Sequence, residues 1–140
     1  MKAVYPVLFT KTENNILIEV PDFDILTEGE NMSNAIEMAR DAIEVKCVSL
    51  EDANKPIPKP SALEGLNAND GVFAGEGNTV ISLVDIDSGE YRRKIDTKTV
   101  RRNVALPSWL NYEAEHAGIN VSRVLQEALI STLVLKTPNY

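Results

Sequence analysis

The first half of the chain shows the alternating hydrophobic pattern of strands, followed by the three-to-four-residue pattern of a helix. Residues 3–9 and 15–20 are rich in β-branched and aromatic side chains, and the polar residues 13–15 between them are typical of a hairpin loop. A third short strand is expected over 23–26, with a turn at 28–30. The pattern therefore predicts three consecutive strands.

A helix is predicted after these strands, with Asn31 or Ser33 as its N-cap. Its apolar residues recur at three- and four-residue steps and form one stripe that should face a core: Met32, Ala35, Ile36, Ala39, Ala42, Ile43 and Cys47. The lone cysteine, Cys47, is most simply a core residue of this stripe.

Residues 55–78 should be mostly loop, because they begin with closely spaced prolines and continue rich in Gly, Asn and Asp. A further strand is predicted over 79–86, and 87–98 is expected to be a polar connection. Pro6 suggests that the first strand has an exposed or bulged edge. The whole pattern predicts an α+β fold, β-β-β-α-loop-β, with the helix on one face of the sheet.

The C-terminal 43 residues follow a different plan, β-α-α. The alternation over 100–107 predicts a strand with Val100, Val104 and Leu106 on one face and Arg101, Asn103 and Ala105 on the other. A helix is expected over 108–117, closed by a left-handed Gly118.

A second helix should begin after the N-cap Asn120 and run to about Leu135, before Pro138. Its apolar face consists of Val121, Val124, Leu125, Ala128, Leu129 and Leu133.

So small a unit buries too little apolar surface to fold alone, and the sequence offers it neither a metal-ligand set nor a cysteine pair. The strand also needs a partner. Two copies of the chain solve both problems if their strands pair antiparallel across a two-fold axis. The sequence thus predicts a homodimer with a core made of Val104, Leu106, Leu110, Val124, Leu125 and Leu129.

In such a dimer, Arg101, Asn103 and Ala105 of both chains would line the exposed face of a two-stranded ribbon. A β-ribbon fits the DNA major groove, where Arg reads guanine, Asn reads adenine and an Ala methyl meets thymine. The free N–H groups at Asn120, Val121 and Ser122 suit a phosphate. The alternative is an ordinary edge strand with solvated arginines.

Charge supports a division into residues 1–97 and 98–140. The net charge is −7, which over the whole chain argues against nucleic-acid binding, but 1–97 carry −9 and 98–140 carry +2. The 44% hydrophobic and 25% charged residues indicate a folded protein. Neither a signal peptide nor a membrane span is evident, and a cytoplasmic location is expected.

The C-terminal run VRRNVALPSWLNYEAEHAGINVSRVLQEALISTL resembles ribbon-helix-helix DNA-binding domains, and the whole chain resembles the HicB family of antitoxins. YPVLF, IEVPDFD, the helix after TEGENMSNAIEMARDAIE, IPKPS and ISLVDID carry the N-terminal part of the likeness. The resemblance implies a partial RNase H-like domain that blocks a HicA-like, messenger-RNA-cleaving toxin. It also implies a C-terminal domain that dimerises and represses its own operon by binding operator DNA.

Transferred by position, the family's base-reading residues fall on Arg101, Asn103 and Ala105, and its phosphate clamp falls on Asn120, Val121 and Ser122. Ala105 is small, so base reading should rest on the other two strand residues. Arg102 alternates onto the core side, where a charge is costly, and we expect it to extend toward the DNA backbone.

Catalysis, metals and cofactors are not expected. An RNase H-type reaction needs clustered carboxylates, and the first strand has none. Asp22, Asp24, Asp85 and Asp87 are interpreted as solvated turn acids, and His116, near Glu113 and Glu115 on a polar helix face, has no evident catalytic partner. A metal-dependent nuclease remains the weakest of three hypotheses.

The acidic N-terminal domain suits a basic, RNA-gripping toxin, with Asp22, Asp24, Glu28 and Glu30 as candidate toxin contacts. An alternative is a stand-alone ribbon-helix-helix regulator whose N-terminal domain senses a ligand or mediates oligomerisation. A homodimer or a higher even oligomer is expected, because an edge strand in the first domain can pair again.

Overall fold

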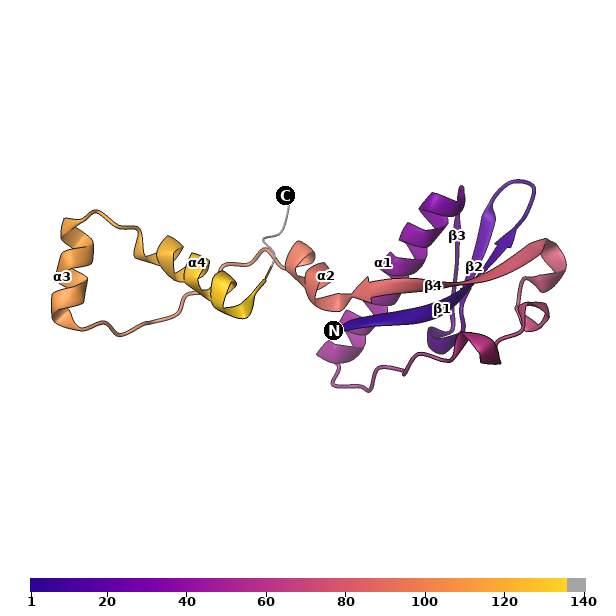
Figure 1. Cartoon of the computed structure of the whole chain (residues 1–140), viewed down its shortest axis with the longest axis horizontal. Coiled ribbons are helices and arrows are strands. Elements are labelled where there is room, and N and C mark those ends of the chain that lie inside the picture. Colours follow the sequence, from indigo (N-terminus) through magenta and orange to yellow (C-terminus); the bar gives the residue numbers. More distant parts are fainter. Residues whose placement is uncertain (136–140) are drawn as a thin grey trace. The chain divides into compact units, whose positions relative to one another are not determined.

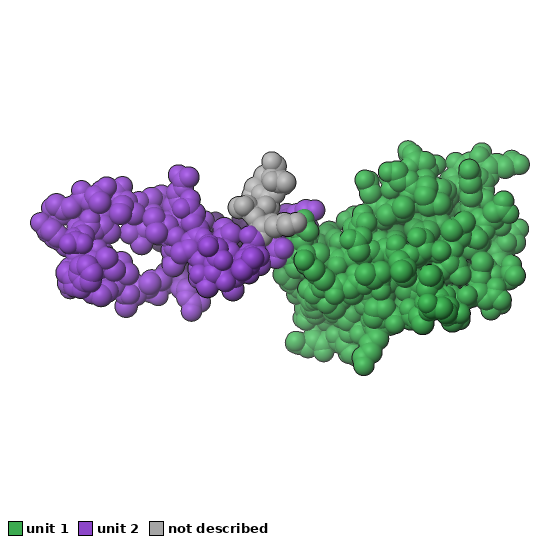
Figure 2. All heavy atoms as spheres, in the orientation of Figure 1, with its two compact units in different colours: residues 1–92 green, residues 93–140 purple. Residues whose placement is uncertain are grey.

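The structure is a computed structural model that describes residues 1–135. The chain divides into two compact units, Met1–Arg92 and a second unit that begins at Arg93 (Figure 2). Each unit has secondary structure of its own, and among residues 1–135 of the single chain the buried hydrophobic core lies in the first unit. The expected boundary at residue 97 falls in the irregular segment 96–107 of the second unit.

A four-stranded antiparallel sheet forms the first unit, in the order β3-β2-β1-β4 (Figure 1). Its strands are β1 (Lys2–Lys11), β2 (Ile16–Val20), β3 (Ile25–Gly29) and β4 (Asn78–Asp87). The β1–β2 hairpin is closed by Thr12, whose Oγ1 accepts the Asn15 N–H at 3.1 Å. The predicted β-β-β-α-loop-β order is therefore observed.

Helix α1 (Met32–Asp52) packs against β2, β3 and β4 and begins at Asn31, whose side chain accepts the N–H of Asn34 at 2.9 Å. Its fully buried residues follow a four-residue step: Ala35, Ala39, Ile43 and Cys47. They meet a core of β-strand residues: Tyr5, Val7, Phe9, Ile16, Ile18, Val20, Val84 and Ile86. The helical stripe is confirmed, except that Met32 is exposed and Ala42 and Ile36 are only half-buried.

Cys47 is a core residue, as predicted from the stripe. Burial, and secondarily the nearby carboxylates of Glu51 and Glu44, raise the pKa of its thiol to about 11. The thiol therefore stays protonated at neutral pH, and since the thiolate is the reactive form, Cys47 has a packing role.

The close approach of α1 to the sheet depends on Gly29 at the end of β3. A methyl group at this position would lie 2.6 Å from the Cα of Ala35, which belongs to the helix backbone. Gly29→Ala should therefore destabilise the fold by about 1–3 kcal/mol. Gly65→Ala is the matched control, because the space around Gly65 is open and its stability should hardly change. Urea denaturation of both variants tests this, and equal midpoints would contradict it.

Residues 53–77 form a loop with three short 3-10 turns, Leu63–Gly65, Ala68–Asp70 and Ala74–Glu76, as the composition predicts. The loop is bound to the sheet by two long-range hydrogen bonds. The Tyr5 hydroxyl donates to the Pro58 carbonyl at 2.6 Å. The Val72 N–H donates to Glu19 Oε1 at 2.9 Å.

Two strand predictions are wrong in detail. The third strand is not 23–26, because Pro21 opens a 3-10 turn and Asp24 adopts a left-handed φ of 53°, so β3 begins at Ile25 and includes Glu28 and Gly29 of the expected turn. At Pro6, β1 pairs with Leu83 of β4 but not with β2, because the β1–β2 pairing begins only at Leu8. The missing N–H of Pro6 therefore interrupts no β1–β2 bond, but Pro6 is fully buried, so this side of the strand is not exposed as expected.

The expected polar connection after β4 is instead a helix, α2 (Ser88–Ile95). Asp87 Oδ1 accepts the N–H of Glu90 at 3.0 Å, as an N-cap does. Arg92 then holds the helix to the end of α1 through ion pairs with Glu51 at 3.0 Å and Asp52 at 2.9 Å.

The second unit contains α3 (Ser108–His116) and α4 (Val121–Leu133). Gly118 has a φ of +67°, and the N–H of Ile119 bonds the Ala114 carbonyl at 3.1 Å, which is the predicted left-handed helix closure. Helix α4 ends at Leu133, two residues before the expected Leu135. Pro138, expected to follow this helix, lies outside the described residues.

Candidate functional site

The residues predicted to read bases lie in the segment 96–107, which forms no regular element in the single chain. Arg101, Asn103 and Ala105 are all exposed, and so is Arg102. A strand is defined by its ladder, so the predicted strand 100–107 requires a partner that a single chain does not provide.

The candidate phosphate site lies at the N-terminus of α4. Asn120 caps the helix and accepts the N–H of Arg123 at 3.1 Å. The N–H groups of Val121 and Ser122 belong to the first turn, where no helical carbonyl is available to them. Arg123 forms an exposed i,i+4 ion pair with Glu127 at 3.2 Å. The helix end thus presents oriented N–H donors beside one arginine.

The predicted dimer core is largely exposed in the single chain. Its six residues, which come from the segment before α3 and from α3 and α4, are 36–54% exposed: Val104, Leu106, Leu110, Val124, Leu125 and Leu129. An exposed apolar stripe that runs over these three consecutive segments indicates a surface that another molecule covers.

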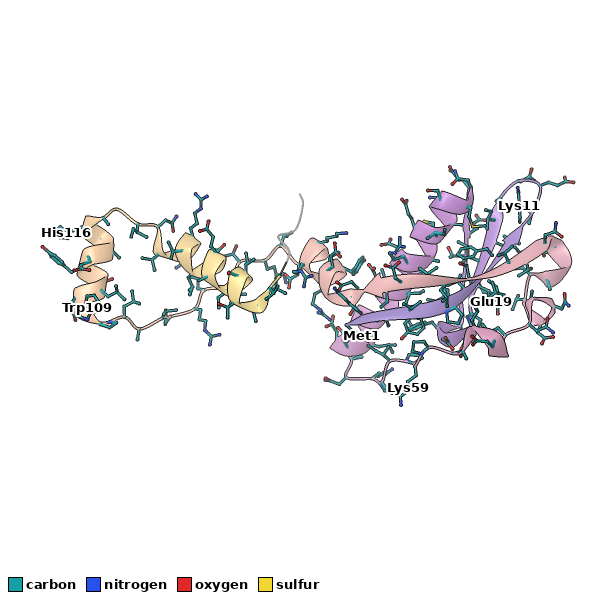
Figure 3. All side chains as sticks on the ribbon, viewed as in Figure 1. Met1, Lys11, Glu19, Lys59, Trp109 and His116 are labelled. Atoms are coloured by element: carbon teal, nitrogen blue, oxygen red, sulfur yellow. The ribbon has the colours of Figure 1, made fainter. Side chains whose placement is uncertain are left out.

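Helix α3 also carries aromatic side chains on its surface, and Trp109 and His116 project from it in Figure 3. The rings of Tyr112 and His116 stack with centroids 3.9 Å apart, and His116 Nδ1 lies 3.1 Å from the Tyr112 carbonyl oxygen. His116 is thus engaged in contacts within its own helix.

The four candidate toxin contacts lie at opposite ends of β3. Asp22 accepts hydrogen bonds from the N–H and hydroxyl of Ser61, and Glu28 accepts one from the Asn15 side-chain amide at 2.8 Å. Asp24 and Glu30 flank the strand on either side and are exposed. Asp22 and Glu28 thus hold loops in place through their hydrogen bonds.

Asp85 and Asp87 are not turn acids as expected, although the Asp85 side chain is 80% exposed. Both lie in β4, and Asp87 caps α2. Asp85 pairs with Arg40 of α1 at 2.8 Å, and the hydrogen bond from this guanidinium holds the pKa of the carboxyl below its ordinary value.

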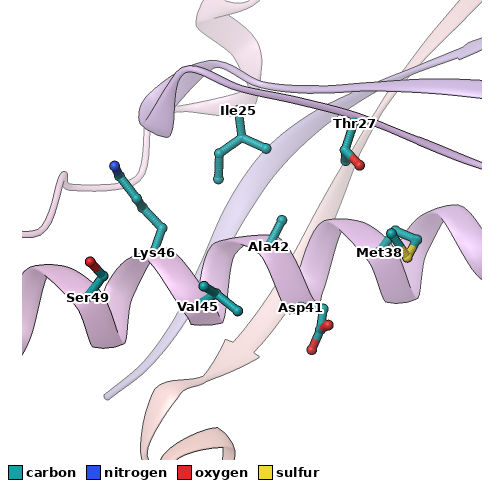
Figure 4. A pocket seen from close by; sticks show the side chains of 8 residues that line it. All are labelled: Ile25, Thr27, Met38, Asp41, Ala42, Val45, Lys46 and Ser49. Atoms are coloured by element: carbon teal, nitrogen blue, oxygen red, sulfur yellow. The ribbon is translucent and has the colours of Figure 1, made fainter.

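A groove that the sequence did not predict lies between β3 and α1, with a volume of about 380 Å³. It is lined by Ile25, Thr27, Met38, Asp41, Ala42, Val45, Lys46 and Ser49 (Figure 4). Ala42 belongs here rather than to the core. The available signal was the second apolar row on α1, Met38, Ala42 and Val45, which recurs at helical spacing.

Within residues 1–135, no three His, Cys, Asp or Glu side chains lie close enough together to hold a metal ion. No helix in the described part of the chain is long and apolar enough to cross a membrane.

Residues 5–127 match the family of HicB-like antitoxins of bacterial toxin–antitoxin systems. The match spans most of the two units described above, and the chain belongs to this family. The resemblance to HicB antitoxins that the sequence motifs indicated is thereby confirmed. None of the curated proteins matches the chain.

The chain is similar to solved structures, and the first two below share its fold. A chain of a toxin–antitoxin complex from Streptococcus pneumoniae is 24% identical, with a TM-score of 0.60 over 94% of this chain and 99% of that one. The antitoxin HicB of Burkholderia pseudomallei is 23% identical, with a TM-score of 0.51 over 93% and 96%. A chain of a HicA3 and HicB3 toxin–antitoxin complex is 23% identical, with a TM-score of 0.49 over 61% and 99%.

Proposed function

We propose that this antitoxin has two activities on two units. The first unit masks a HicA-like toxin that cleaves messenger RNA, and the second binds operator DNA as a homodimer and represses the operon. The observation that carries the proposal is the family match over both units, combined with an apolar stripe on the second unit that a single chain leaves exposed.

Charge supports toxin masking by the first unit. Residues 1–92 carry 17 acidic and seven basic side chains, a net charge of −10. A protein that grips RNA needs a positive surface, and an acidic partner is attracted to such a surface and can cover it. The partial RNase H-like character of this unit is part of the same proposal and rests on its β-β-β-α-β order.

The second unit supports DNA binding as a ribbon-helix-helix dimer. Two chains would pair their 100–107 segments as a ribbon, with Arg101 and Asn103 facing the bases and the α4 N-terminus facing a phosphate. Arg102 would reach the DNA backbone. Burying the exposed stripe would provide the core that the unit lacks by itself.

Family membership favours this reading over a stand-alone regulator, and the neighbouring gene provides a further distinction. A small, basic open reading frame beside the gene would encode the toxin, whereas a regulator needs no such neighbour.

The third hypothesis, a metal-dependent nuclease, predicts that the purified chain by itself cleaves RNA when Mg²⁺ or Mn²⁺ is added. We expect no cleavage under those conditions.

The central prediction is that the chain co-purifies with the product of the neighbouring gene and suppresses its RNA cleavage. Residues 1–97 alone should do the same, because they contain the complete sheet, α1 and α2. The measurement is a mixing assay on labelled RNA with increasing antitoxin. A folded fragment that leaves cleavage unchanged would contradict the assignment of masking to the first unit.

A further inference from the structure

The groove between β3 and α1 combines an open strand edge with an apolar wall. Ile25 and Thr27 point from β3 toward Ala42, and Met38 and Val45 extend the apolar side along the helix (Figure 4). Strand β3 is the last strand of the sheet and pairs only with β2 among the described residues. An extended peptide can add to such an edge by main-chain hydrogen bonds and place alternate side chains in the groove.

The two edges of the sheet differ in how they are protected. On β4, Arg40 Nε donates to the Asp85 carbonyl at 2.9 Å, and the Asp87 N–H donates to Glu44 Oε1 at 3.4 Å. Side chains of α1 thus occupy main-chain groups at one end of that strand. No comparable side-chain bond to a main-chain group of β3 is found within residues 1–135. Strand β3 also lacks Pro and Lys, the residues that commonly block an edge.

Charge around the groove selects the kind of partner. Asp24 and Glu30 are exposed at the two ends of β3, and Asp41 lines the groove, with Lys46 as the cation among the lining residues. The unit as a whole carries −10. A basic segment with apolar side chains at alternate positions complements this surface, whereas a second copy of the acidic unit would be repelled.

We propose that this groove is the docking surface for the toxin, which would add an extended basic segment to β3. This inference rests on the proposed function and makes it more specific, because it names the surface. It also revises the candidate contacts: Asp24, Glu30 and Asp41 face the toxin, while Asp22 and Glu28 hold loops in place.

The test uses the full-length chain and the neighbouring gene product. Ala42→Trp fills the groove, and we expect it to weaken toxin binding by roughly 30-fold or more, the effect of losing a central contact. Ser82→Trp is the matched control, because it adds the same side chain at an exposed position of β4, and its affinity should stay within about threefold of wild type. Isothermal titration calorimetry measures both, and circular dichroism verifies folding.

Asp41→Lys is a second variant that leaves the core untouched, since Asp41 is exposed. It should weaken toxin binding by about tenfold. If wild type binds toxin and both groove variants bind equally well, the groove assignment is wrong while the proposed function stands. If Ser82→Trp weakens binding as much as Ala42→Trp, the β3 groove is likewise not the specific surface.

Two other outcomes would also overturn the inference. If wild type neither binds the toxin nor suppresses its cleavage, the proposed function fails together with the groove assignment. If Ala42→Trp lowers the mass of the free protein in sedimentation while toxin affinity is unchanged, the groove is an interface between copies of this chain.

Discussion

Leu129→Asp should convert the protein from a dimer to a monomer and abolish specific operator binding. Leu129 lies on the apolar face of α4 and is 51% exposed in the single chain, so the first unit does not depend on it. In the proposed dimer it is buried, and an unpaired buried carboxylate costs about 3–5 kcal/mol, here once per chain. DNA binding should fail with the dimer, because the reading ribbon consists of one strand from each copy.

Gln126→Asp is the control for this change, since it adds the same charge to α4 at an exposed position outside the apolar face. Sedimentation equilibrium gives the mass of each variant, and a gel-shift titration with the DNA upstream of the gene gives operator affinity. A Leu129→Asp protein that remains a dimer would show that the α4 stripe is not the dimer interface.

In the C-terminal unit, the single chain forms the predicted helices but not the predicted strand 100–107. The helix limits at Gly118 and Asn120 were predictable, because a left-handed glycine and an N-cap are local signals. The strand 100–107 remains a prediction, since its ladder would be formed with another molecule. The same holds for the base-reading role of Arg101 and Asn103, which depends on that strand.

In the first unit, periodicity predicted α1 and the strands, because their apolar faces meet one core. Helix α2 was missed because SGEYRRKI has no clear apolar stripe, and Arg92 holds it to α1 by ion pairs that no local pattern shows. Asp87 followed by Glu90 was an available capping signal.

The groove could not be predicted because it depends on the tertiary position of α1 beside β3. The small residues Gly29 and Ala35 bring the helix backbone close to the end of this strand. The 3-10 turn at Pro21 also obscured the alternation of side chains along β3, because the strand begins at Ile25, two residues after the expected start.

Arg101→Ala should weaken operator binding by roughly 1–3 kcal/mol, about 5- to 150-fold at fixed salt, and leave the dimer intact. Arg101 is exposed and supports no packing in the single chain, so a loss of affinity reports a lost DNA contact. The loss should be confined to operator DNA, since a residue that reads guanine contributes little on an unrelated sequence.

Lys98→Ala is the matched comparison, because Lys98 lies in the same irregular region and is also exposed. If Lys98 contacts a phosphate, its removal should weaken binding to operator DNA and to unrelated DNA equally. The slope of log affinity against log salt concentration should also fall by about one, the share of one phosphate contact. Residues 98–140 carry a net charge of only +2, so few counterions are released and specificity should depend strongly on Arg101 and Asn103. Equal losses on both DNAs for Arg101→Ala would instead assign Arg101 to the phosphate backbone and move sequence reading elsewhere.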